Sequence, residues 1–195
     1  MNASLDAPRP SFLRKAGLLV VLAGLGGVFG YGAATLTDGS LSSWEDELAV
    51  VMAAAMTGVG LITAFMVARR PADIPKGCGI LQVIVMLLAA AMFLLPVFGP
   101  ALASPEMVFA AVLLLVVVQS AANLMLWRTA DEMLRRVMLE TSALAFWSLQ
   151  LALFIYAAAE RLGLVGTITA WGLMGILMGV YFIASAVAAA RRGLH

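Results

Sequence analysis

The sequence predicts an all-α fold, a polytopic integral membrane protein with a bundle of six transmembrane helices. Three observations predict it. Hydrophobic residues make up 63% of the chain and charged residues 12%, whereas a soluble domain needs far more polar surface. The apolar residues fall into six long runs. The basic residues gather in the segments that would lie on one side of those runs.

Each apolar run is long enough to cross a bilayer, because about 20 apolar residues span the hydrocarbon core. Turn-forming residues such as Asp38-Gly39-Ser40 and Gly99-Pro100 separate the runs. The first run is too long for a signal-peptide core of roughly 7–15 residues, so we expect it to remain as a span. Residues 1–195 therefore form a single transmembrane domain. The predicted spans are approximately 16–37, 47–68, 78–98, 107–127, 137–159 and 164–188.

The basic residues predict the orientation, because Lys and Arg resist translocation and gather in cytoplasmic loops. Eleven of the twelve lie on one side of the predicted spans, and Arg161 alone lies on the other. With five acidic residues against the eleven, the first side carries +6, while six acidic residues against Arg161 give the second side −5. Both termini are therefore predicted to be cytoplasmic.

Residues that could carry chemistry are scarce. Cys78 is the sole cysteine and His195 the sole histidine, which excludes paired-histidine haem ligation, a CxxC redox pair and a histidine-based metal cluster. Glu140 and Glu160 are predicted near opposite interfaces, too far apart to cooperate in acid–base chemistry. The sequence thus predicts no enzymatic activity, no catalytic residue, no cofactor, no metal and no nucleic-acid partner.

The densest group of charges lies between the fourth and fifth spans. Read as a helix, the stretch places Asp131 four residues before Arg135, acid first, which favours side-chain pairing. Glu132 lies four residues before Arg136, which Glu140 can also reach. The candidate residues for binding a partner or lipid headgroups are Arg128, Asp131, Glu132, Arg135, Arg136 and Glu140.

Two interpretations of this charged stretch are open. The favoured one is a solvated helix start that anchors the fifth span at the interface, since exposed ion pairs contribute little and nearby carboxylates offset the charge that anionic headgroups require. The alternative is a binding site for lipid headgroups or a protein partner, built on Arg128, Arg135 and Arg136.

The run from Asp131 to Glu140 leads into a predicted helical hairpin that closes with Arg191-Arg192. Over about the last 85 residues, this arrangement resembles a group of small bacterial inner-membrane proteins with no assigned activity, which carry Asp-Glu-x-x-Arg-Arg-x-x-x-Glu at the cytoplasmic start of a helix. Leu134 and Met138 stand where those proteins tend to have Gln. The resemblance implies a bacterial inner-membrane hairpin with a charged cytoplasmic anchor, and it implies no reaction.

Polar side chains also occur inside the middle spans. Gln119 and Asn123 lie four residues apart, hence on one helix face. Amides in a membrane usually form interhelical hydrogen bonds, so we expect them to join the fourth and fifth spans, with Gln82 of the third span as a further candidate partner. The alternative is a polar lining for a solute path; a lack of mid-span ionisable residues argues against coupled transport and leaves a facilitator open. The candidates are Gln82, Gln119, Asn123, Ser148 and Gln150.

Glycines cluster in the first and last spans. Small residues at i,i+4 spacing allow helices to approach closely, so we expect these two spans to pack against each other, with a dimer interface as the alternative. The candidate packing residues are Gly26, Gly30, Gly172, Gly175 and Gly179.

The favoured function is that of a non-enzymatic inner-membrane protein, an accessory or assembly subunit that binds membrane lipids and other membrane proteins or itself. The alternative is a small-solute permease or channel, with its polar path near Gln119, Asn123 and Gln150. An intramembrane enzyme ranks third, because the sequence contains no recognisable base, nucleophile or metal site.

Overall fold

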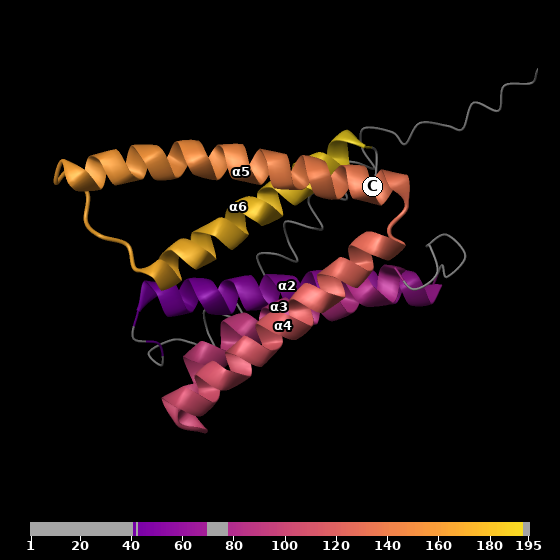
Figure 1. Cartoon of the computed structure of the whole chain (residues 1–195), viewed down its shortest axis with the longest axis horizontal. Helices are drawn as coiled ribbons and strands as arrows, with labels where there is room; N and C mark the ends of the chain where they lie inside the picture. Colours follow the sequence, from indigo (N-terminus) through magenta and orange to yellow (C-terminus); the bar gives the residue numbers. More distant parts are fainter. Residues whose placement is uncertain (1–40, 42, 70–77, 193–195) are drawn as a thin grey trace, which may run out of the picture.

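The computed structural model describes residues 41, 43–69 and 78–192. Five helices in these residues are long and apolar enough to cross a membrane (Figure 1), and the chain is a multi-pass, all-α membrane protein. The helices are α2 (Trp44–Arg69), α3 (Cys78–Phe98), α4 (Pro105–Thr129), α5 (Glu132–Arg161) and α6 (Ala170–Arg191), with a 3-10 turn, η2 (Gly99–Ala101), after α3. The predicted first span, 16–37, lies outside the described residues.

Capping residues decide where two of the helices begin. α5 starts five residues before the predicted fifth span, because the Asp131 side chain accepts a hydrogen bond from the backbone N–H of Leu134 at 2.7 Å. α6 starts six residues after residue 164, where Thr169 accepts from the backbone N–H of Gly172 at 3.1 Å. Gly163 follows α5 with φ of 71°, a conformation that ends helices and favours glycine.

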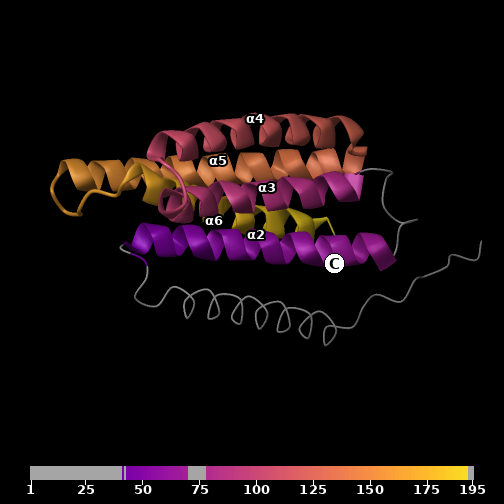
Figure 2. The same cartoon turned by 90° about the horizontal axis from the view of Figure 1, so that it is seen from below.

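α2 contacts both helical hairpins (Figure 1), and it lies along one edge of the described helices in Figure 2. The α3–α4 hairpin contacts α2 through α3, and the α5–α6 hairpin contacts α2 through α6. α4 and α5 are joined by a short turn at Ala130-Asp131 and diverge from it (Figure 1). The predicted joining of the fourth and fifth spans along their length is therefore wrong, because α4 packs mainly against α3 and α5 mainly against α6, while α4 and α5 meet near their turn.

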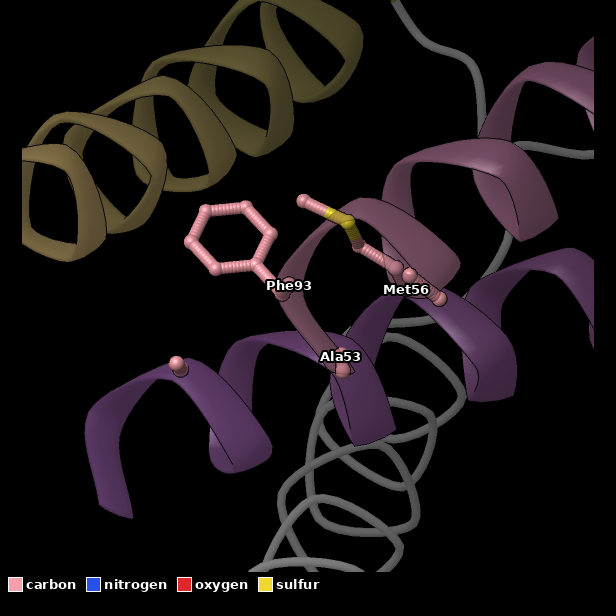
Figure 3. Packing of buried hydrophobic residues seen from close by; sticks show 5 residues of the cluster. Ala53, Met56 and Phe93 are labelled. Atoms are coloured by element: carbon pink, nitrogen blue, oxygen red, sulfur yellow. The ribbon is translucent and has the colours of Figure 1, made fainter. Parts of the chain in front are cut away.

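The main hydrophobic core joins α2, α3 and α6. Met56 of α2 and Phe93 of α3 are buried beside small alanines such as Ala53 (Figure 3). The Phe93 ring lies against Trp171 of α6, with centroids 5.7 Å apart. A second cluster lies near the α4–α5 turn, where Leu134 and other residues at the start of α5 pack against α3 and α4. The first cluster joins α2 to both hairpins, and the second joins α3, α4 and the start of α5.

Two glycines of α6 allow it to pack closely against α2. A Cβ atom on Gly172 would lie 2.9 Å from Cγ of Glu45, and one on Gly175 would lie 2.7 Å from Cδ2 of Leu48. A Cβ atom on Gly179 would meet nothing within 4 Å. The other two predicted packing residues, Gly26 and Gly30, lie outside the described residues.

Candidate functional site

The described charges gather at the two ends of the helices. We call the end formed by Arg69, Cys78, the α4–α5 turn and Arg191 the basic end, and the opposite end the acidic end (Figure 1). The acidic end has five described carboxylates and one described arginine: Glu45, Asp46, Glu47, Glu106 and Glu160, and Arg161. The basic end has six described arginines and three described carboxylates: Arg69, Arg128, Arg135, Arg136, Arg191 and Arg192, and Asp131, Glu132 and Glu140.

Arg135 closes the end of α4. Its Nε donates to the carbonyl of Trp127 at 3.1 Å, and its Nη2 donates to the carbonyl of Arg128 at 3.1 Å. The last carbonyls of a helix have no intrahelical donors, so this guanidinium satisfies two of them. The predicted pair of Arg135 with Asp131 is not formed, because Asp131 caps α5 and Arg135 reaches back across the turn.

The other two carboxylates of the basic end have different partners. Glu132 pairs with Arg136 at 2.7 Å, as their spacing predicts, and both side chains are exposed. Glu140 does not pair with Arg136. It accepts from Nε and Nη2 of Arg192 at 3.0 and 2.9 Å, and it lies 3.5 Å from Arg191. Glu140 therefore ties α5 to the end of α6.

Arg128, Arg136 and Arg191 are among the exposed arginine side chains of the basic end. Arg128 forms no ion pair with another described residue, while Arg136 and Arg191 are 60% and 62% exposed although each has a carboxylate neighbour. Exposed guanidinium groups at a membrane interface are suited to phosphate headgroups or to acidic groups of a partner. Arg135 is not free for this use, because it is bound to the carbonyls of α4.

The polar candidates of the middle spans lie in different environments. Gln82 and Gln119 are half-buried, whereas Asn123, Ser148 and Gln150 are exposed. The Oε1 atom of Gln119 is buried without a hydrogen-bond partner among the described residues. No hydrogen bond between described residues joins these polar groups of α4 to those of α5. The divergence of α4 from α5 separates them.

Tyr156 has a role at the acidic end that sequence reasoning missed. Its hydroxyl donates to the carbonyl of Gly166 at 2.9 Å and accepts from the backbone N–H of Ile168 at 2.8 Å. It thereby holds the loop that leads into α6. The only signal in the sequence was an aromatic residue near a predicted interface, which does not reveal a bond to a loop ten residues away.

Metal-binding geometry is not found in the described part of the chain, where no three His, Cys, Asp or Glu side chains gather. Cys78 is buried in the second hydrophobic cluster. No family model matches this sequence, and comparison with curated proteins and with solved structures gives no significant match. The function is therefore inferred from the geometry of the two ends and of the helix faces between them.

Proposed function

We propose that this chain is a non-enzymatic protein of the bacterial inner membrane, an accessory or assembly subunit that binds membrane proteins through α5. In this proposal both termini are cytoplasmic, and the basic end lies at the cytoplasmic interface. The surplus of arginine over carboxylate at that end supports the orientation, because Lys and Arg are retained on the cytoplasmic side. Arg128, Arg136 and Arg191 then face lipid headgroups or a partner's acidic groups.

The observation that carries the proposal is the exposure of α5. Its buried residues, Val137, Thr141 and Ala145, all lie in the half nearer the basic end. From residue 146 to Arg161 no residue of α5 is buried. This half presents Phe146 and Phe154, which are 61% and 76% exposed, together with the amide of Gln150. An amide at membrane depth is costly to leave in lipid and favours a neighbouring helix.

The alternative of a small-solute permease gains no specific support. Its predicted polar path needs Gln119, Asn123 and Gln150 around one passage, and these residues lie on two diverging helices. Two serines of these helices also bond along their own helices, since Ser120 donates to the carbonyl of Val116 at 2.7 Å and Ser142 donates to that of Met138 at 2.9 Å.

The test is purification from the native membrane in a mild detergent, followed by identification of the proteins and lipids that co-purify. We expect a stoichiometric membrane-protein complex that is lost when Phe146 and Phe154 are both changed to Ala. The matched control changes Phe109 and Leu113 of α4, which are 62% and 51% exposed, and should retain the complex. A chain that emerges alone and conducts a solute in liposomes would overturn the proposal in favour of the permease.

A further inference from the structure

Gln150 lies in the middle of an exposed aromatic stripe. Phe146 precedes it by four residues and Phe154 follows it by four, so the three side chains lie on one face of α5. All three are exposed, and the amide of Gln150 forms no hydrogen bond with another described residue. Ser148, two residues earlier, lies on nearly the opposite face, since each residue turns a helix by about 100°.

Gln150 also lies midway between the two ends of the membrane-spanning part of α5. It lies ten positions after Glu140 on the basic side and ten positions before Glu160 on the acidic side. At about 1.5 Å per residue, each distance is about 15 Å, which is half of a hydrocarbon core about 30 Å thick. The amide is therefore placed at the bilayer midplane, where neither interface can supply water and a side chain of this length cannot reach one.

A second copy of the chain would place its own Gln150 amide at the same depth in the membrane. Copies of one chain insert in the same orientation, because each carries the same bias of Lys and Arg. Around a two-fold axis normal to the membrane, α5 of each copy runs parallel to α5 of the other, and a residue near the axis meets its own equivalent. Gln150 would then meet a Gln150 at the same depth, whereas a different partner helix would need a polar group of its own at that depth.

The chemistry of the amide agrees with its depth. A glutamine carries both an acceptor oxygen and a donor NH2 group, so two copies can each donate to the other. We infer that the chain forms a two-fold symmetric dimer through α5, in which the two Gln150 amides bond reciprocally at the bilayer midplane between layers of Phe146 and Phe154. This rests on the part of the proposed function in which α5 binds protein, and it names the partner.

Disulfide crosslinking in native membranes tests the interface. In a Cys78→Ala background, Phe154→Cys or Phe146→Cys keeps Gln150 and places a thiol one turn away on the same face. Oxidation should give crosslinked dimers from these two variants. Ser148→Cys is the matched control, at nearly the same depth on the opposite face, and should give no crosslinked dimer. Equal crosslinking from all three positions, or none from either phenylalanine position, overturns the inference.

The role of the amide needs a second measurement. Subunit counting by photobleaching in liposomes of phosphatidylethanolamine and phosphatidylglycerol gives the dimer dissociation constant without new thiols. Interhelical hydrogen bonds in membranes contribute about threefold each on average, so loss of a reciprocal pair in Gln150→Leu should weaken the dimer about tenfold. Gln119→Leu on α4 should leave it unchanged. Dimers that are equally stable in Gln150→Leu, or a wild-type chain that stays monomeric at all densities, overturn the inference.

These results separate the inference from the proposed function. A different membrane protein bound to α5 of a monomeric chain would overturn the inference and leave the proposed function standing. A dimer through Gln150 with no other membrane protein in the purified complex would support the inference and count against the role of accessory subunit.

Discussion

Glu140, about two turns into α5, connects that helix to the end of α6, 52 residues further along the chain. The carboxylate is largely shielded, at 21% exposed, whereas its partners Arg192 and Arg191 are 40% and 62% exposed. Solvent screening limits what such a group contributes. The Glu140 contact matters for how the helices are arranged, because α6 is the single neighbouring helix of α5 over most of its length. The contact holds the basic ends of α5 and α6 together.

Replacing Glu140 by Gln should lower the free energy of unfolding by about 1 kcal/mol, because two arginines lose their shared carboxylate while the side chain keeps its size. Unfolding by denaturant in detergent micelles measures it. Glu132→Gln is the matched control, since it removes only the exposed pair with Arg136, and its effect should be smaller, within about 0.5 kcal/mol. An equal loss in both variants would contradict a special role for Glu140.

Local spacing in the sequence predicts some of these contacts and misses others. The pair of Glu132 with Arg136 follows from their i,i+4 spacing within one helix. The spacing of Asp131 and Arg135 is the same, yet their pair does not form, because a helix begins between them and its unsatisfied N–H groups compete for the carboxylate. The bond of Glu140 to Arg192 was not predictable from spacing, since it depends on the return of α6 to the basic end.

At the scale of helices, the close contact of α2 with α6 depends on the absence of side chains on α6. Gly172 and Gly175 lie against Glu45 and Leu48, and Thr169 adds a hydrogen bond to Glu45 at 3.2 Å. Since no hydrophobic effect drives helices together in lipid, such close van der Waals packing is a main source of association. This contact attaches the α5–α6 hairpin to α2.

Gly175→Ala should lower the free energy of unfolding by about 1–3 kcal/mol, because the new methyl group would overlap the Leu48 side chain and force it or the helix to move. Thermal unfolding in detergent is the measurement. Gly179→Ala provides the control on the same helix, where a Cβ atom meets nothing within 4 Å, and it should be neutral or slightly stabilising. A destabilisation of similar size in the control would show that helix propensity, not close packing, decides the effect.

For the whole molecule, the decisive feature is the separation of charge between the ends. All five described helices run between the basic end and the acidic end (Figure 1). α5 is 30 residues long, about 45 Å, and therefore extends beyond a hydrocarbon core of about 30 Å. Its first turns carry the charges of the basic end, and its last residues reach the exposed loop at Leu162.

The proposed orientation predicts which residues are reachable from outside the cell. In a Cys78→Ala background, Leu162→Cys at the acidic end should react with a membrane-impermeant maleimide in intact cells, since Leu162 is 74% exposed and lies beyond α5. Arg128→Cys at the basic end should react only after the membrane is opened. Labelling of position 128 in intact cells would reverse the orientation and place both predicted cytoplasmic termini outside.

The class of protein follows from the sequence alone, since long apolar runs must become helices in a membrane, where every backbone polar group needs an internal partner. The end at which each described charge lies follows from the sequence too, because charges are costly within the bilayer. Which helices are neighbours depends on how they pack in three dimensions. Apolar faces look alike along a sequence, and the close fit of Gly175 to Leu48, the bond from Glu140 to Arg192 and the exposure of Gln150 arise only when the helices are packed.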